Sequence, residues 1–420
     1  MRRDFAYGIG KVLALLCVVF FAVAIQPKVA AASSTLGAWS PVVQWPMIPI
    51  HAVLLPDGRV MTYGTQGGAI YDVWDPSAGL SAGHVTLPNN TGNNIFCSAQ
   101  LVLPGGTGVF IAGGGSEVVP NIESNLFDYG SDTLTLKNAM KRPRWYATPT
   151  TLLNGEIYLQ GGTGGEDLPE IRDATGNFRL LTGAGTNALN YSYPRNFLAP
   201  DGRVFGYEHY GVMYYVDTSG SGALTVTGQL TGTKGITSSA AMFLPGRILQ
   251  FGGFSNQAVV IDINGGAPVV TATQTMSSWR KWANATVLAN GKVLATGGSE
   301  VGNEMTGVNY SAEIWDPVTG EWTRGAEGNL ARLYHSTALL LPDASVLVAG
   351  GGNPGPLFND NAEIYYPPYL YDASGEWAAR PTIQSAPTAI AIGETFLVDV
   401  AATDDVSRVV MVKTGSVTHS

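Results

Sequence analysis

The chain has 420 residues, of which 13% are charged and 45% are apolar, with a formal net charge of −9 and a sequence pI near 5.0. This balance offers no positive field that would attract nucleic acid or an anionic membrane, so we expect small molecules or neutral polymers as partners. The 53 glycines and 24 prolines are typical of a compact all-β protein with many tight turns.

The first segment of the chain predicts export. Three basic residues come before or at the start of an apolar run at 12–25, and small residues at 29–32 offer a cleavage site. The run is short for a membrane span. We therefore interpret residues 1–32 as a signal peptide, which predicts a secreted or periplasmic protein without a membrane partner and leaves Cys97 as the only cysteine of the mature chain.

One pattern then recurs seven times: an apolar stretch, a tight turn, a second apolar stretch and a glycine. The copies occupy 51–64, 99–114, 148–162, 195–208, 240–253, 284–298 and 336–352. Their marker glycines are 49, 48, 45, 46, 45 and 53 residues apart, close to the period of roughly 50 residues that kelch units show.

Each copy predicts a β-hairpin, because glycine supplies the positive φ that its turn needs. Outer strands are expected to follow, as in 312–323 and in its weaker echo at 362–377. Four strands per unit and seven units predict a seven-bladed kelch-type β-propeller over residues 33–378.

The pattern of the chain changes after the propeller. Residues 379–420 alternate apolar and polar side chains over short runs, which predicts the start of an immunoglobulin-like β-sandwich domain. A complete domain of this kind takes about 100 residues. We therefore expect this domain to be truncated in the sequence.

A propeller brings equivalent positions of its blades together around one axis, so position in the repeat is a spatial coordinate. Counted back from the marker glycines, Cys97, Tyr146 and His335 fall on the same position, and Tyr334 is adjacent. We expect them at the rim of the axial channel. The same count in other blades selects three further residues: Tyr191, Ser238 and Trp282.

Each of these residues also has a purely structural interpretation. A single cysteine is usually a small buried hydrophobe, a lone histidine is more often satisfied than a ligand, and tyrosines carry much of any β core. Their coincidence at one position favours a functional site. Imidazole and phenolate suit a copper ion, whereas zinc seldom takes tyrosine. The other histidines, His51, His84 and His209, lie off this position and are interpreted as structural.

Four motifs carry a resemblance to a known family: Phe96-Cys97, Arg144-Trp145-Tyr146, 332–336 and 415–420. With them the chain resembles the galactose oxidase and glyoxal oxidase family of copper radical oxidases over 36–420. The absence of the extra N-terminal carbohydrate-binding domain and the Arg-Trp-Tyr motif are closer to the glyoxal oxidase branch.

The resemblance implies a copper site and a cofactor made by the protein itself. Cys97 and Tyr146 would form a thioether-linked radical cofactor, and Tyr146 would also bind copper. His335 and His419 would be imidazole ligands, and Tyr334 would be the axial phenolate and general base. The implied enzyme is a monomeric, secreted oxidase that converts an aldehyde or primary alcohol with O2 and releases hydrogen peroxide.

Two departures from the family pattern keep alternatives open. Gly164 stands where galactose oxidases have a tryptophan stacked on the cross-linked tyrosine, so Trp282 is a candidate to cover that ring instead. Asn94 and Ser98-Ala99 also differ from the usual residues around the cysteine. One alternative is a non-catalytic secreted kelch propeller that binds carbohydrate or protein, and another is an inactive scaffold that keeps copper.

Overall fold

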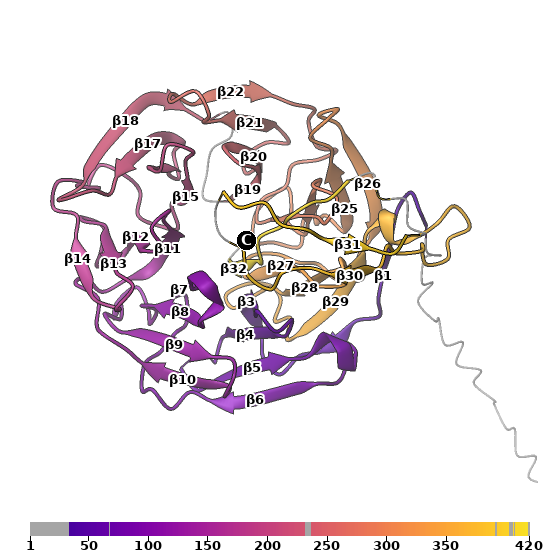
Figure 1. Ribbon diagram of the computed structural model, residues 1–420, viewed down its shortest axis with the longest axis horizontal. Helices are drawn as coiled ribbons and strands as arrows, with labels where there is room; N and C mark the ends of the chain where they lie inside the picture. Colours follow the sequence, from indigo (N-terminus) through magenta and orange to yellow (C-terminus); the bar gives the residue numbers. More distant parts are fainter. Residues whose placement is uncertain are drawn as a thin grey trace, which may run out of the picture.

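The computed structural model describes residues 33–66, 68–231, 237–390, 393–402, 406 and 408–418. The segment interpreted as a signal peptide and the predicted ligand His419 lie outside the described residues. Seven antiparallel sheets stand as blades around one axis, which Figure 1 shows end-on. The prediction of an all-β, seven-bladed propeller is therefore confirmed.

Each of the seven predicted hairpins forms the two innermost strands of a blade. Blade 1 contains β3 (Pro49–Leu54), β4 (Val60–Gly64), β5 (Ile70–Trp74) and β6 (His84–Pro88), and blade 2 contains β7 (Ala99–Val102), β8 (Val109–Ala112), β9 (Ser124–Asp128) and β10 (Thr133–Leu136). Blade 3 contains β11 (Trp145–Thr151), β12 (Ile157–Thr163), β13 (Glu170–Arg172) and β14 (Phe178–Leu180), and blade 4 contains β15 (Arg195–Leu198), β16 (Val204–Tyr207), β17 (Val212–Asp217) and β18 (Ala223–Leu230). Blade 5 contains β19 (Ser238–Leu244), β20 (Arg247–Gly252), β21 (Ala258–Asp262) and β22 (Val269–Ala272), and blade 6 contains β23 (Asn284–Val287), β24 (Val293–Thr296), β25 (Ser311–Trp315) and β26 (Trp322–Glu327). Blade 7 contains β27 (Ser336–Leu340), β28 (Val346–Gly350) and β29 (Asn361–Tyr366).

The start of the propeller closes the ring by completing blade 7. Strand β1 (Ala38–Trp39) pairs antiparallel with β29, and β2 (Val43–Gln44) pairs with the same strand. The expected outer strand within 362–377 is only half right, since β29 forms but 371–377 contributes a single bridge between Tyr371 and Trp377. The outermost position is taken by β1 instead.

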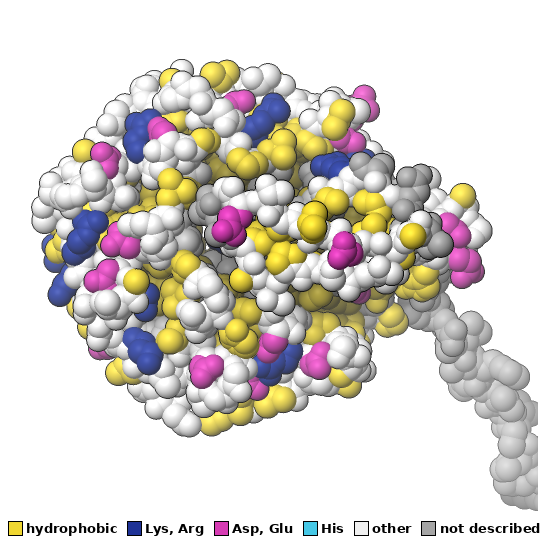
Figure 2. Space-filling model, in the orientation of Figure 1, with side chains coloured by type: hydrophobic (Ala, Val, Ile, Leu, Met, Phe, Trp, Pro, Cys, Tyr) yellow, Lys and Arg dark blue, Asp and Glu magenta, His cyan; other side chains and the backbone are white. Residues whose placement is uncertain are grey.

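The C-terminal segment lies across one face of the ring in Figure 1. It contains β30 (Ile383–Ser385), β31 (Asp399–Val400) and β32 (Ser416–Thr418), of which β30 and β31 pair with each other. Strand β32 instead pairs antiparallel with β3, the inner strand of blade 1, near the middle of the ring. Apolar side chains are visible on this face in Figure 2, and the immunoglobulin-like domain stays a prediction.

In the described part of the chain, seven hydrophobic core clusters are each built from two neighbouring blades. A small eighth cluster joins Ala38 to Leu370 and Tyr371. Met61 and Tyr63 of blade 1, for example, pack with Ile111 and Phe127 of blade 2. Burial between blades therefore holds the ring together, as a repeat architecture requires. Among the described residues no helix is long and apolar enough to cross a membrane.

Five of the seven marker glycines allow one blade to approach the next. A Cβ atom on Gly113 would lie 2.0 Å from the carbonyl oxygen of Arg144, and the neighbouring Gly114 N–H donates to that oxygen at 2.8 Å. The same contact recurs between Gly297 and Arg332, where a Cβ would lie 2.5 Å from the carbonyl oxygen. Any side chain here would push apart the inner strands that carry the site.

We expect Gly113→Ala to lower the free energy of unfolding by about 1–3 kcal/mol more than Gly92→Ala does. Both glycines have a positive φ, 69° and 73°, so both substitutions carry similar backbone strain. A Cβ on Gly92 meets nothing within 4 Å, which makes it a matched control for the close approach at Gly113. Urea unfolding measures both, and equal losses would contradict the argument.

Candidate metal centre

The residues that the sequence places at one position share one unusual backbone conformation. Cys97, Tyr146 and His335 have φ values of 56°, 74° and 70°, in the left-handed region that non-glycine residues rarely adopt. Each residue in this conformation costs on the order of 1–2 kcal/mol of folding free energy, and such residues cluster at functional sites. The predicted equivalence of the three positions is therefore visible in the backbone.

Backbone hydrogen bonds join this position from blade to blade. The Tyr146 N–H donates to the Cys97 carbonyl at 3.1 Å, and the Tyr193 N–H donates to the Tyr146 carbonyl at 2.9 Å. Tyr193 also has a positive φ, 42°. Tyr193, rather than the predicted Tyr191, thus occupies the equivalent position in blade 4.

The error in blade 4 comes from the choice of marker glycine. In blades 1, 3, 5 and 6 the marker lies six residues after the turn glycine, as Gly161 follows Gly155. In blade 4 Gly206 follows Gly202 by only four, so the count begins two residues too early. In blade 5 the count of fifteen residues back from Gly252 gives Thr237, so the predicted Ser238 is one residue too late. The structure agrees with the corrected count, because the Trp282 N–H donates to the Thr237 carbonyl at 3.1 Å.

Two phenols from opposite parts of the sequence meet at the axis. The Tyr146 and Tyr334 hydroxyls share a hydrogen bond shorter than usual. The imidazole of His335 stacks on Tyr334 with ring centroids 3.8 Å apart and an interplanar angle of 25°. Burial raises the pKa of both phenols, and the neighbouring Cys97 raises them further. Both phenols are therefore neutral at pH 7 unless a bound cation displaces a phenol proton.

The Cys97 side chain is fully buried beside these rings. Burial raises the pKa of its thiol, while the neighbouring side chains of Tyr146 and Trp145 act in the opposite direction. The thiol is therefore protonated and unsuited to nucleophilic chemistry at neutral pH. Its contact with Tyr146 is the arrangement that a thioether between the two residues requires.

The protonation state of His335 is determined by its surroundings. Its Nδ1 lies 2.8 Å from the carbonyl oxygen of Gly352, which can only accept, so Nδ1 carries the proton and Nε2 carries the lone pair. Burial lowers the pKa of the imidazole to about 4, although this hydrogen bond opposes the shift. A neutral histidine oriented by a backbone carbonyl is the usual form of a metal ligand.

Two rings cover Tyr146, and neither is Trp282. Trp145 stacks on Tyr146 at 3.8 Å between centroids and Tyr193 stacks on it at 4.6 Å. Trp282 lies against Tyr334 instead, at 4.4 Å. The sequence missed Tyr193 because of the miscounted marker in blade 4.

Gly164 could not be a tryptophan in this backbone. A Cβ at this position would lie 2.7 Å from Cγ of Pro143 and 3.0 Å from its carbonyl oxygen, and φ is +88°. The loop around Gly164 therefore leaves no room for a side chain at this position. Tyr193 provides an aromatic face for Tyr146 from a different blade.

The described donors fit a copper ion. Two phenol oxygens and one imidazole nitrogen are N and O ligands of the kind that divalent copper prefers. Among the described residues no three His, Cys, Asp or Glu side chains could hold a metal, so any site here depends on the tyrosines. The fourth predicted ligand follows Thr418, which ends β32 and whose side chain hydrogen-bonds to Tyr193.

His51 contacts the site although it was interpreted as structural. Its ring is completely buried, stacks on Tyr63 at 4.3 Å between centroids, and its Nε2 accepts a hydrogen bond from the Cys97 N–H at 3.2 Å. Burial lowers the pKa of His51 to about 3, so the ring is neutral. The sequence signal was present, since His51 is the one polar residue within the apolar strand β3.

Buried ion pairs hold the segments that lead into three of these positions. Arg144, Arg280 and Arg332 are almost fully buried, and each pairs with a glutamate of its own blade: Glu170 at 2.8 Å, Glu313 at 3.0 Å and Glu363 at 3.3 Å. Each arginine also donates to the carbonyl of its marker glycine: Gly161, Gly297 or Gly350. Each arginine thereby connects the segment before the first strand of its blade to the second strand through the glycine carbonyl and to the third strand through the glutamate.

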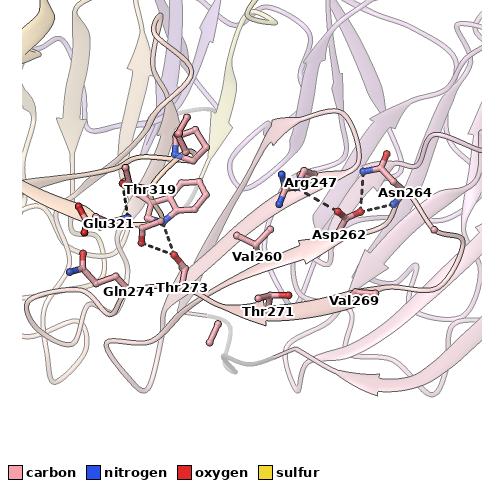
Figure 3. Close-up of a pocket in the computed structure, with 16 residues that line it drawn as sticks. Arg247, Val260, Asp262, Asn264, Val269, Thr271, Thr273, Gln274, Thr319 and Glu321 are labelled. Atoms are coloured by element: carbon pink, nitrogen blue, oxygen red, sulfur yellow. Dashed lines mark hydrogen bonds and ion pairs between the residues drawn. The ribbon is translucent and has the colours of Figure 1, made fainter.

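A groove of about 1050 Å³ lies elsewhere, between the outer strands of blades 5 and 6 (Figure 3). Arg247 and Asp262 face each other along one side, with 3.6 Å between Nε and a carboxylate oxygen. Its 16 lining residues include no His, Cys or Tyr. The groove is therefore separate from the candidate metal centre.

Fold and site together define a seven-bladed propeller with two phenols, an imidazole and a thiol gathered at its axis. No protein-family model matches the chain. The chain is 26% identical to a galactose oxidase of Gibberella zeae over an alignment of 435 positions, covering 92% of this chain and 62% of that protein. It is 25% identical to the aldehyde oxidase GLOX of Vitis pseudoreticulata, covering 72% and 65% of the two chains.

A solved structure shows the same fold. It is a fungal alcohol oxidase of the AA5 family in complex with copper, with a TM-score of 0.74, 23% identity and coverage of 84% of this chain and 81% of that one. The resemblance to the galactose oxidase and glyoxal oxidase family is thus confirmed at the level of sequence and fold. The chain spans somewhat less than two thirds of the length of the curated relatives named above.

Proposed function

We propose that this protein is an exported copper radical oxidase that oxidises an aldehyde or primary alcohol with O2 and releases hydrogen peroxide. The observation that carries the proposal is the meeting of Cys97, Tyr146, Tyr334 and His335 at one point of the ring, although they come from three different blades. Sequence similarity to galactose and aldehyde oxidases supports the same class. We place it nearer the glyoxal oxidase branch.

Tyr146, Tyr334, His335 and His419 would hold the copper ion. When bound, copper supplies a one-electron redox partner, whereas the oxidation of an alcohol or a hydrated aldehyde removes two electrons. The second electron would be taken up by the oxidised ring of Tyr146, which would be linked through a thioether to Cys97 and is stacked between Trp145 and Tyr193. The covalent link and the stacked rings hold this phenol in one orientation.

Tyr334 would act as the general base. With copper bound, Tyr334 would be held as its phenolate, which can accept the substrate proton, and its oxygen is already hydrogen-bonded to the Tyr146 oxygen. The rings of Trp282 and His335 hold the phenol from its sides. The Tyr146 ring would then receive the substrate hydrogen, and O2 would return the site to its starting state as it leaves as peroxide.

Intact mass tests the proposal most directly. The full-length protein prepared without copper should lose about two hydrogens when copper and O2 are added, because the S–H and ring C–H bonds are replaced by one C–S bond. Peptide mapping should place the link between Cys97 and Tyr146. Cys97→Ala is the control, and it should show no mass change and no peroxide release above background with a panel of aldehydes and alcohols.

Three other results would overturn the proposal. An unchanged mass and no retained copper would favour a propeller that binds carbohydrate or protein without catalysis. Retained copper with an intact thioether and no peroxide from any substrate would favour an inactive scaffold. Peroxide release by Cys97→Ala at the parental rate would contradict the radical cofactor itself.

A further inference from the structure

A buried polar cluster lies between blades 1 and 2, directly behind Cys97. It consists of His51 and Tyr63 of blade 1 and Ser98 and Gln100 of blade 2, all between 0% and 4% exposed. Buried polar groups are hydrogen-bonded to one another when they specify a single arrangement. This cluster, called here the His51 cluster, has no role in the chemistry described above.

The directions of its hydrogen bonds are determined by backbone groups. The Gln100 Nε2 lies 2.8 Å from the carbonyl oxygen of Val417, which can only accept, so the amide nitrogen faces β32 and the amide oxygen faces His51. The Gln100 Oε1 then accepts from His51 Nδ1 at 3.0 Å. This leaves Nε2 of His51 as the acceptor of the Cys97 N–H.

The cluster also receives contacts from the end of the chain. The Ser416 hydroxyl donates to the backbone carbonyl of Gln100 at 2.9 Å, and β32 pairs with β3 so that Thr418 lies opposite His51. The Tyr63 hydroxyl lies 2.9 Å from the Ser98 hydroxyl, with which it hydrogen-bonds, and 3.2 Å from the Gln100 Oε1, to which it donates. The strand that leads to the predicted ligand His419 is therefore connected to Cys97 through two side chains.

We propose that His51 and Gln100 are positioning residues for the thioether, which hold Cys97 in its left-handed conformation once β32 has docked. The inference rests on the proposed function, since it concerns the same cofactor. Cys97 must keep an unfavourable φ of 56° while its thiol faces the Tyr146 ring, and the amide of Cys97 is the group that His51 holds. The Cys97 thiol is therefore placed correctly only when β32 is docked against β3.

The step that this arrangement assists is balanced. The Cys97 S–H and one ring C–H of Tyr146 break, one C–S bond forms, and two electrons and two protons pass to O2, which is reduced to hydrogen peroxide. His51 takes no part in the bond changes. It affects only how often the thiol lies against the ring.

A pair of variants separates positioning from general stability. His51→Gln places an amide near the position of Nε2 and can still accept from the Cys97 N–H, whereas His51→Asn reaches only to the position of Nδ1. After copper is added to metal-free protein under air, we expect His51→Gln to form the thioether at close to the parental rate and His51→Asn to form it about tenfold more slowly. Intact mass follows the rate.

Hydrogen exchange at the Cys97 amide gives a second readout that needs no copper. The amide should be protected in the metal-free parent and in His51→Gln and should exchange faster in His51→Asn. Gln100→Met keeps the side-chain length but removes both hydrogen bonds of the Gln100 amide, so it should also slow the formation of the thioether. This variant tests the proposal if His51→Asn does not fold. If His51 contributed only to general stability, its substitution would change the unfolding midpoint, but His51→Asn and His51→Gln would form the thioether at the same rate.

The outcomes distinguish the two proposals. Equal cross-linking rates for the parent, His51→Asn and Gln100→Met would overturn the positioning role and leave the oxidase intact. A parent that never forms the thioether would overturn the oxidase and this inference with it. The positioning role would be established if His51→Asn both lost protection of the Cys97 amide and formed the thioether more slowly.

Discussion

Tyr334→Phe should release peroxide about 10²–10⁴-fold more slowly than the parent, the range that removal of a general base typically produces. The substitution removes only the hydroxyl that hydrogen-bonds to Tyr146 and keeps the ring that packs against Trp282 and His335. The fold and the thioether should therefore persist. Steady-state peroxide assays, with intact mass to confirm the cross-link, measure the effect.

Tyr369→Phe is the matched control for this change. Its hydroxyl is also partly buried, donates to the Ala344 carbonyl at 2.6 Å, and lies on the three-residue turn that follows blade 7. Its loss should cost about 1 kcal/mol of stability and leave turnover unchanged. A Tyr334→Phe enzyme as fast as this control would show that proton transfer uses another group.

Glu363→Gln should lower the free energy of unfolding by about 3–5 kcal/mol, because it leaves the guanidinium of Arg332 buried without its carboxylate. Both side chains are at most 2% exposed, and the pair is 3.3 Å apart. Glu363 also accepts from the Asn329 backbone N–H at 3.0 Å. Burial already lowers the pKa of Arg332, and the attraction of Glu363 opposes this shift.

Asp167→Asn provides the comparison at the surface. Asp167 pairs with Arg142 at 2.9 Å, with side chains 41% and 34% exposed, so solvent screens the pair. We expect a loss of about 0–1 kcal/mol. Denaturant titration of both variants measures the difference, and similar losses would mean that Arg332 finds another partner or water when Glu363 is neutral.

The sequence predicted the parts of the fold that depend on local chemistry. Asp-Gly and Asn-Gly turns mark the hairpins of blades 1, 3, 4 and 6. In blades 3, 5 and 6 a glycine six residues after the turn glycine marks where the next blade approaches. Blade 4 shows the limit of this reasoning, because Gly206 is not the equivalent of Gly161 and the count selected Tyr191 instead of Tyr193. A spacing measured from the turn glycine would have found the residue that stacks on Tyr146.

Other features depend on contacts between distant parts of the chain. The role of His51 follows from Gln100 and Val417, which no periodicity connects to it. The completion of blade 7 by β1 likewise depends on residues more than 300 positions apart. The candidate site was predictable to the extent that its residues sit at equivalent places in the repeat, and Cys97, Tyr146 and His335 do.

The pairing of β1 with β29 also determines when the molecule can finish folding. A ring whose last sheet needs both ends of the propeller cannot close on the ribosome until nearly all of its blades have emerged, and long-range closure of this kind is slow. Once formed, the same pairing should make global opening rare, because any blade must part from two neighbours before it unfolds. An exported protein would gain persistence outside the cell from such a barrier.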